Sequence, residues 1–315
     1  MSRWRTVLLV LSLPAAVACL LAPAAPWIWP GELAVHWSRH AALALLPAMA
    51  AWRHRSWCTG ALLLCFLAGL WPWLAAPVVA APVPAPGAPT MRVVSGNLYA
   101  FSEDQSPALR AVLDRDADVV VLVECRSSRP EAHLLEDPRY PYRAIGLPRA
   151  NRLADGIAVV SRWPLSAVAH NPHFGLRMLV GTPQGPVTLM VLHAPTPLTP
   201  WHWRERQRLL SVLAAEAADV SGPLVVAGDW NCTEASHDWR LVSAAGLAGP
   251  AGLRTGTWPW LLGPLGIRID HVLVKGLSLG SASTFAIPTS DHRGVEAVVG
   301  FAPSALDRST YRAAP

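Results

Sequence analysis

Long apolar runs dominate the first eighty residues of the chain. The stretches 6–29 and 57–80 contain no charged residue, and each is long enough to cross a bilayer as a helix. The run at 37–52 is shorter, which fits either a short span or a re-entrant segment. We therefore predict a transmembrane region over residues 1–80 with about three spans, at 6–29, 37–52 and 57–80.

Arginines flank these runs in two pairs and bear on the topology. Arg3 and Arg5 lie before the first run, and Arg53 and Arg55 lie just before the last one. Because Lys and Arg are enriched on cytoplasmic flanks, three spans place both pairs in the cytoplasm and the rest of the chain outside. Two spans would place the second pair outside. A competing interpretation takes the first run as a secretory signal with small residues at 22–24, and leaves the last run as the anchor.

A proline-rich segment follows the last apolar run. Residues 81–90 read APVPAPGAPT, and prolines at this spacing favour extended polyproline structure. We expect this segment to be a semi-rigid linker that holds the following domain off the bilayer.

The pattern changes to short apolar runs after the linker. Runs of strand length alternate with segments whose apolar positions recur at helical spacing, beginning with a strand at 91–99, a helix at 107–116 and a strand at 117–125. Antiparallel and crossover connections are both needed to join these elements. The pattern therefore predicts a mixed-sheet α/β domain over 91–302 and a C-terminal tail over 303–315.

Polar side chains end many of these apolar runs. Strand ends are where α/β proteins commonly assemble their sites. A cap or a turn explains any one of these residues equally well, but the whole ordered set favours a site. The residues are Asn97, Glu124, His193, Asp229, Asn231, Asp270, Asp291 and His292.

Charge is distributed unevenly along the chain. Residues 1–90 hold five arginines and a single acidic residue, Glu32, whereas residues 91–315 carry 21 Lys and Arg against 20 Asp and Glu. The net charge of +5 is therefore mainly a property of the apolar part. Domains that bind nucleic acid usually carry a surplus of basic residues, so the composition argues against a nuclease without excluding a local basic patch.

The five cysteines do not predict a disulfide framework. Cys19, Cys58 and Cys65 lie in apolar runs, where we interpret them as small buried hydrophobic residues. Cys125 and Cys232 each directly follow a candidate site residue. An oxidising compartment would permit these two to pair if the two strand ends lie close together.

Six short motifs follow one another along the chain: Gly96-Asn97, VVVLVE ending at Glu124, LHAP at His193, GDWN at 228–231, RIDH at 268–271 and SDH at 290–292. In this order they resemble the endonuclease/exonuclease/phosphatase superfamily, whose fold is DNase I-like. The resemblance covers essentially all of residues 91–302, and the combination of GDWN, RIDH and SDH makes it specific. It implies a four-layer sandwich of two mixed β-sheets flanked by helices, here preceded by transmembrane helices.

The resemblance also implies a divalent cation, Mg²⁺ or Mn²⁺, held by oxygen ligands from Glu124, Asn97 and Asp291. Hard cations prefer such oxygens, and hydrolysis of a phosphate ester needs positive charge and a positioned water. Many relatives carry a second amide or acid two residues after Asn97, where this chain has Tyr99. This departure argues against a second metal site at that position.

Catalytic roles follow from the same resemblance. Asp270 resembles the partner that orients His292, which would act as a general base or as a charged clamp on the phosphate. Asp229 would orient the attacking water, and Asn231 would donate a hydrogen bond to a phosphoryl oxygen. His193 would contact the phosphate or act as an acid.

The apolar N-terminus ahead of this domain resembles the bacterial branch associated with teicoplanin-type resistance, whose members are thought to act on undecaprenyl pyrophosphate. We therefore expect a multi-pass protein of the cell membrane whose extracytoplasmic domain hydrolyses a lipid-linked or small phosphorylated substrate. Four tryptophans suit a lipid-facing rim, although core packing explains them equally well; they are Trp201, Trp203, Trp258 and Trp260.

Two alternative functions stay open. One is a phosphodiesterase, either a nuclease or a sphingomyelinase-like enzyme, and the other is a non-catalytic membrane binding protein. No protein partner is predicted.

Overall fold

The structure, a computed structural model, describes residues 3–146, 156–171, 175–250 and 255–301, so the predicted tail lies outside the described residues. Contacts within the chain divide it into two compact units. The sheet unit comprises Val79–Ala194, Ser211–Trp230 and Ala244–Pro315, and the helical unit comprises Met1–Val78, Pro195–Leu210 and Asn231–Ser243. The domain boundaries predicted from the sequence stay a prediction.

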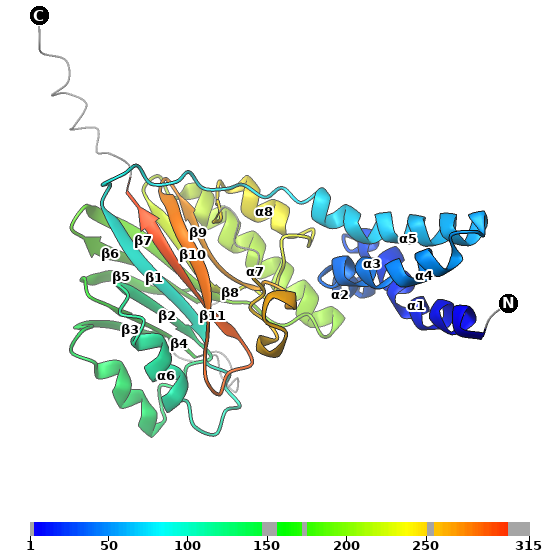
Figure 1. Ribbon diagram of the computed structural model, residues 1–315. Helices are drawn as coiled ribbons and strands as arrows, with labels where there is room; N and C mark the ends of the chain where they lie inside the picture. Colours follow the sequence, from blue (N-terminus) through cyan, green and yellow to red (C-terminus); the bar gives the residue numbers. More distant parts are fainter. Residues whose placement is uncertain (1–2, 147–155, 172–174, 251–254, 302–315) are drawn as a thin grey trace, which may run out of the picture. The chain divides into compact units, whose positions relative to one another are not determined.

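Two mixed β-sheets form the sheet unit (Figure 1). The first has the order β10-β11-β1-β2-β4-β3 and the second the order β5-β6-β7-β8-β9. The pairs β1–β2 and β7–β8 are parallel and the remaining neighbours are antiparallel. The first sheet contains β1 (Thr90–Asn97), β2 (Val119–Val123), β3 (Tyr142–Gly146), β4 (Ile157–Ser161), β10 (Ser278–Ala286) and β11 (Arg293–Gly300). The second contains β5 (Leu165–Asn171), β6 (Gly175–Thr182), β7 (Gly185–His193), β8 (Leu224–Asp229) and β9 (Asp270–Lys275).

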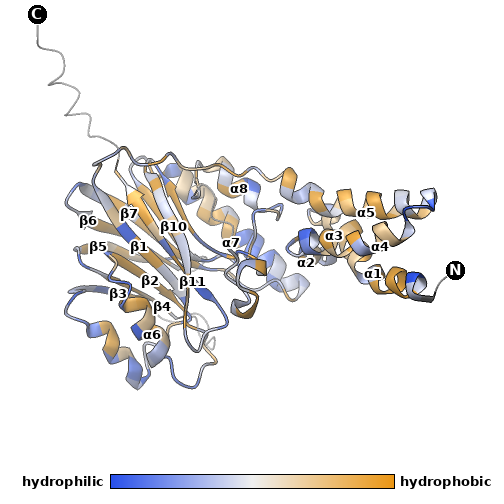
Figure 2. Ribbon diagram, viewed as in Figure 1, coloured by the Kyte–Doolittle hydropathy of each residue, from blue (hydrophilic) through white to orange (hydrophobic). Residues whose placement is uncertain are grey.

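The central strands are apolar on both faces, and hydrophobic colouring runs along them in Figure 2. Every residue of β2 and of β8 is buried. Valine and leucine in such runs suit a strand that is covered on both sides. This accounts for why the sequence reads here as continuous apolar runs rather than as an alternation.

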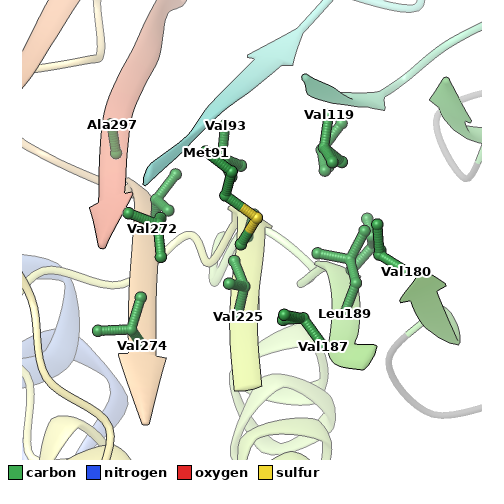
Figure 3. Close-up of a cluster of buried hydrophobic side chains, with 14 of the residues drawn as sticks. Met91, Val93, Val119, Val180, Val187, Leu189, Val225, Val272, Val274 and Ala297 are labelled. Carbon is green, nitrogen blue, oxygen red and sulfur yellow. The ribbon is translucent and has the colours of Figure 1, made fainter. Parts of the chain in front are cut away.

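One face of each sheet contributes to a shared core (Figure 3). Val93 and Val119 of the first sheet belong to the same cluster of buried side chains as Leu189, Val225 and Val272 of the second. Successive side chains of a strand point to opposite faces, so the residues between these ones face outward. The core between the sheets is therefore built from every second residue.

Helices cover the outer faces of both sheets. On the first sheet, buried residues of α6 (Ser106–Leu113) and η2 (Pro130–Glu136) cluster with outward-facing strand residues such as Val94 and Val120. On the second sheet, Glu216 in α7 (Pro200–Asp219) contacts β5 and β6 through Asn171 and Arg177. These four layers confirm the predicted α/β sandwich.

The predicted linker is bonded to the sheet unit rather than free. The amide of Ala81 donates to the carbonyl of Gly249 over 2.8 Å, and the amide of Leu279 donates to the carbonyl of Pro82 over 2.8 Å. A buried side chain at Ala81 adds to this attachment. The segment is extended, as its prolines predict, but its carbonyl groups serve as hydrogen-bond partners, so at least its first part is not a spacer.

The helical unit contains two helices that are long and apolar enough to cross a membrane, namely α1 (Arg3–Leu21) and α5 (Ser56–Leu74). The predicted span at 37–52 is instead two seven-residue helices, α3 (Ser38–Ala44) and α4 (Leu46–Trp52). The helix breaks there because Pro47 has no amide hydrogen to continue the α3 ladder and starts α4 instead, and the choice between a short span and a re-entrant segment stays a prediction. The remaining helices are η1 (Ala22–Ala24), α2 (Trp29–Val35) and α8 (Trp239–Ala244).

The short helices return alongside α1. The indole of Trp52 donates to the carbonyl of Arg5 over 3.2 Å, whereas Cys19, near the other end of α1, contacts the carbonyl of Ser38. Helices α1 and α5 therefore run in the same direction, with α3 and α4 running back between their ends. The two arginine pairs that flank α1 and α5 consequently lie at the same end of this bundle.

A buried ionic network joins three segments of the helical unit. Arg206 is fully buried and forms ion pairs with Glu32 of α2 and, over 3.2 Å, with Asp238. Ser236 donates to Glu32 over 2.8 Å, and His36 lies 3.1 Å from the same carboxylate. Burial alone would raise the pKa of Glu32, but the charge of Arg206 and the hydrogen bond from His36 outweigh it and lower the pKa from 4.5 to about 2.

We predict that Glu32→Gln destabilises the protein by about 3 kcal/mol, because it leaves the buried Arg206 charge only partly compensated. The measurement is thermal unfolding of the full chain in detergent. Since the pKa of Glu32 is lower in the folded state, its contribution is complete above about pH 4.5 and is lost as the pH falls toward 2. Arg177→Met, which removes an exposed pair, is the control and should change stability by less than about 1 kcal/mol. Equal losses in the two variants would contradict the prediction.

Candidate active site

The polar side chains that end the apolar runs converge where the two sheets meet. Asn97 ends β1 and Glu124 directly follows β2, its parallel neighbour. In the second sheet, His193 ends β7 and pairs in register with Asp229 at the end of β8, which in turn pairs with Asp270 at the start of β9. Strand register therefore places three of these residues side by side in one sheet.

Asn97 connects the two sheets. Its amide nitrogen lies 2.9 Å from Glu124 Oε1 and 3.1 Å from Asp229 Oδ2, so it donates to a carboxylate of each sheet. Its side-chain oxygen accepts the amide hydrogen of Tyr99 over 2.9 Å. The first-strand asparagine therefore holds the two carboxylates next to each other.

The backbone at Glu124 is in the left-handed region, with φ of 55°. Such a conformation is uncommon for a residue with a side chain and costs on the order of 1 kcal/mol or more. Buried Gln105 stabilises it: its amide nitrogen donates to the carbonyl of Glu124 over 2.7 Å, and its oxygen accepts the amide hydrogen of Arg126 over 3.0 Å. The amide of Ala100 also donates to Glu124 Oε2 over 2.7 Å. Sequence reasoning missed Gln105, because an isolated glutamine ahead of a helix carries no signal of its own.

His292 is held between carboxylates. Its Nδ1 lies 2.8 Å from Asp270 Oδ2, and its Nε2 lies 3.9 Å from Asp229 Oδ2. Burial alone would lower the pKa of His292, but the charge of Asp270, the hydrogen bond to it and the charges of Asp229 and Asp291 raise the pKa to about 10. The imidazole therefore carries a positive charge at neutral pH, which favours the role of a charged clamp over that of a general base.

His193 faces the other side of the same cluster. Its Nε2 lies 3.5 Å from Glu124 Oε1 and 3.8 Å from Asp229 Oδ2. Its Nδ1 is buried and has no hydrogen-bond partner among the described residues. The structure therefore brings together Asn97, Glu124, His193, Asp229, Asp270 and His292.

The SDH segment contributes unequally. Ser290 donates to the carbonyl of Asn97 over 2.7 Å and accepts the amide hydrogen of His292 over 3.0 Å, so its hydroxyl is a structural link. Asp291 has a partly exposed side chain, and its Oδ2 accepts the indole hydrogen of Trp258 over 3.0 Å. The role of Asp291 as a metal ligand stays a prediction, as does a contact of Trp258 with lipid.

Asn231 belongs to the helical unit, two residues after Asp229 in the chain. Its φ is 45°, and its carbonyl accepts a hydrogen bond from the guanidinium of Arg206 over 2.5 Å. The buried arginine therefore stabilises the backbone of a predicted catalytic residue. Sequence reasoning did not single out Arg206 among the 25 arginines, because nothing local distinguishes it.

Two cysteines directly follow candidate site residues. Cys125 and Cys232 are both buried, and no disulfide forms between them in the structure. Burial raises the pKa of Cys125 to about 12 and also raises that of Cys232. The disulfide that the sequence leaves open is therefore not present, and neither thiol is ionised at neutral pH.

The cluster contains two overlapping groups of potential metal ligands. The ligand atoms of Glu124, His193 and Asp229 all lie within 4.8 Å of one another, and so do those of Asp229, Asp270 and His292. A protonated His292 cannot ligate a cation, so the first group fits Mg²⁺ or Mn²⁺ better. Asn97 lies beside that group with its amide nitrogen toward Glu124 and its oxygen toward Tyr99, so its role as a metal ligand stays a prediction. Among the described residues, Asp291 belongs to neither group.

Solved structures share the fold at low sequence identity. An endonuclease/exonuclease/phosphatase from Beutenbergia cavernae DSM 12333 is 20% identical with a TM-score of 0.56, over 68% of this chain and 72% of that chain. A humanized D. rerio TDP2 is 15% identical with a TM-score of 0.54, over 67% of this chain and 99% of that one. Sphingomyelinase C from Streptomyces griseocarneus is 18% identical with a TM-score of 0.50, over 68% of this chain and 100% of that one.

Comparison with curated proteins gives no match. The profile of the endonuclease/exonuclease/phosphatase family, by contrast, matches residues 94–292, which is more than half of the chain and includes every candidate site residue. The chain therefore belongs to the endonuclease/exonuclease/phosphatase family.

Proposed function

We propose that the protein is a membrane-anchored, divalent-metal-dependent hydrolase of phosphoric esters. The observation that carries the proposal is the contact of Asn97 with Glu124 and Asp229, because it gathers hard oxygen ligands from both sheets at one point. Enzymes of this family are in general metal-dependent phosphoester hydrolases. A non-catalytic binding role would not need carboxylates and imidazoles in this arrangement.

The cluster suggests a division of labour among the residues. Glu124 would hold the cation, which supplies positive charge to the phosphoryl oxygens when bound, and Asn97 would join it once its amide turned to present the oxygen that now accepts from Tyr99. Asp229, beside both histidines, would orient the attacking water. His292, kept protonated by Asp270, would clamp the phosphate through Nε2, since its Nδ1 already faces Asp270.

The remaining polar residues would complete the phosphate site. His193 would contact the phosphate through Nε2, the nitrogen that faces Glu124 and Asp229. Asn231, with its backbone held by Arg206, would donate a hydrogen bond to a phosphoryl oxygen. Asp291 would reach the cation only by a change of its bond to Trp258.

The substrate that we propose is a lipid-linked phosphate, such as undecaprenyl pyrophosphate, at the outer face of the cell membrane. Figure 2 colours helices α1 and α5 as mostly hydrophobic, and both expose apolar side chains, among them Leu11 and Leu64, which suits contact with lipid rather than with water. Both arginine pairs lie at one end of these helices, which supports a cytoplasmic location for that end. The near-neutral charge of residues 91–315 favours a lipid over a nucleic acid.

A phosphodiesterase is the second candidate. The similar structures include a TDP2 and a sphingomyelinase C by their names. The same cluster would serve a diester, because a cation and a positioned water are needed for either bond. Substrate comparison is therefore required to choose between the two.

We predict that Glu124→Ala lowers metal-dependent phosphate release by at least about 100-fold, because it removes the carboxylate that best suits the cation. The assay uses the full chain in detergent with Mg²⁺ and follows phosphate release from undecaprenyl pyrophosphate, fragmentation of DNA and p-nitrophenolate release from bis(p-nitrophenyl) phosphate, because hydrolysis of a diester releases no inorganic phosphate. EDTA should abolish turnover, and added Mg²⁺ should restore it. Glu103→Ala removes an exposed acid and is the matched control. Full activity of Glu124→Ala would refute the metal assignment, and turnover of a diester alone would favour the phosphodiesterase.

We predict that Asp270→Asn lowers kcat by at least about 100-fold while leaving metal affinity nearly unchanged. The substitution removes the charge that raises the pKa of His292, so this pKa should fall from about 10 toward 6.5. NMR titration of the imidazole resonances measures the shift, and the pH profile of kcat should lose activity at a lower pH than in the wild type. An unchanged pKa would contradict the proposed role of Asp270.

The proposed topology is tested by reporters fused to the C-terminus of the full chain. A periplasmic-type alkaline phosphatase should be active there and a fluorescent protein that folds only in the cytoplasm should be dark. Arg3 and Arg5 changed together to Glu should reduce the fraction of chains with this orientation. Cytoplasmic fluorescence of the unaltered chain would overturn the outward-facing location.

A further inference from the structure

A cavity of about 440 Å³ lies directly beside the carboxylate cluster in the sheet unit. Its walls are mainly the side chains of Tyr99, Trp260, Ile287 and Pro288, and Asp291 lies at its edge. A volume of this size suits a small ligand or a segment of a hydrocarbon chain. The roles assigned to the polar residues above leave this cavity unexplained.

The cavity shares its wall with the metal-binding side of the site. The amide of Tyr99 donates to Asn97 Oδ1 over 2.9 Å, and Ser290, another lining residue, donates to the carbonyl of Asn97 over 2.7 Å. The left-handed backbone of Tyr99, with φ of 57°, follows immediately after the strand that ends at Asn97. A ligand that fills the cavity is therefore adjacent to a phosphate bound at the cation beside Asn97 and Glu124.

An apolar loop borders the cavity. Its stem is closed by two hydrogen bonds between Trp258 and Ile267, of 3.0 and 2.7 Å, and the amide of Trp260 donates to the carbonyl of Asp291 over 2.9 Å. Its tip, η4 (Trp260–Leu265), exposes large apolar side chains, with Leu261 74% and Leu265 68% exposed. The loop is thus tied to the site at its base and presents hydrocarbon at its tip.

The charges around the cavity argue against a nucleic-acid strand. Among the described residues that line it there is no lysine or arginine, and Asp291 is the single charged one. A neighbouring phosphate diester would meet a carboxylate there without a cation from the protein. Hydrocarbon next to one reacting phosphate avoids this repulsion and buries apolar surface.

We propose that this cavity and loop form a subsite for the hydrocarbon portion of a phosphorylated amphiphile, directly next to the reacting phosphate. The inference rests on the proposed function for the location of the phosphate. Tyr99 lines the cavity and donates its amide hydrogen to Asn97, so it forms the wall between the two halves of the substrate. Phe101, 70% exposed and edge-on to Tyr99 at 5.8 Å, extends the apolar rim.

The test measures binding rather than turnover, so that it does not depend on the reaction. Octylphosphonate and ethylphosphonate carry the same head and resist hydrolysis. Calorimetry with Mg²⁺ and the full chain in nanodiscs gives both Kd values, and empty nanodiscs supply the background. Octylphosphonate should bind at least about tenfold more tightly than ethylphosphonate, because its additional methylenes leave water.

Two variants change the cavity from opposite directions. Ala286→Trp fills the cavity and Trp260→Ser removes an aromatic wall. Each should lower the octyl preference, which is the Kd of ethylphosphonate divided by that of octylphosphonate, at least about fivefold. Ala169→Trp on β5 and Trp201→Ser on α7 are matched controls at other exposed positions and should keep it.

Three outcomes would overturn the subsite. The first is that neither phosphonate binds, and the second is that the wild type binds octylphosphonate no more tightly than ethylphosphonate. The third is that all variants keep the same ratio of the two Kd values, which would mean that the octyl group enters the bilayer rather than the cavity. If the wild type hydrolyses no phosphate ester but still binds octylphosphonate more tightly than ethylphosphonate, the proposed function is refuted and the subsite is not.

Discussion

The site depends on one electrostatic constraint, which is the close approach of several carboxylates at one end of the buried β-sandwich. Glu124, Asp229 and Asp270 approach one another where the two sheets meet, and uncompensated negative charge in such surroundings is costly. Part of the compensation is built in, since Asp270 keeps His292 protonated and the amide of Asn97 donates to two of the carboxylates. The remainder suits a divalent cation, on which enzymes of this family in general depend.

Holding these groups in place requires backbone conformations that ordinary residues avoid. Tyr99, Glu124 and Asn231 all have positive φ. Each is stabilised by neighbours rather than by its own preference: Tyr99 by Asn97, Glu124 by Gln105, and Asn231 by Arg206. The residues that support these backbone conformations are therefore buried amides and a buried guanidinium. Their substitution would displace the side chains that they hold in place.

The helical unit is more than an anchor in this view. Its buried ion pairs between Arg206, Glu32 and Asp238 connect the N-terminal helices with the segment that follows β8. Replacement of such a network by apolar residues is often neutral, so its presence favours a role in specifying how these segments pack. Arg206 also donates to the carbonyl of Asn231, so this network and the backbone of Asn231 depend on one side chain.

Local sequence determined the elements and the chemistry: apolar runs of strand length ended by acids, amides and imidazoles, and long apolar runs without charge in the first eighty residues. The strand and helix pattern predicted a mixed-sheet α/β domain, and the resemblance of the ordered motifs implied the sandwich. The break between α3 and α4 follows from Pro47 itself, whereas the attachment of the linker and the supporting roles of Gln105 and Arg206 were not predictable in this way. Each of these three depends on a partner distant in sequence, and so does the apolar cavity beside Asn97, whose walls come from three separate loops. Which polar residue faces which, and which arginine is buried, are decided by strand register and packing, because hydrogen bonds and burial are properties of neighbours in space.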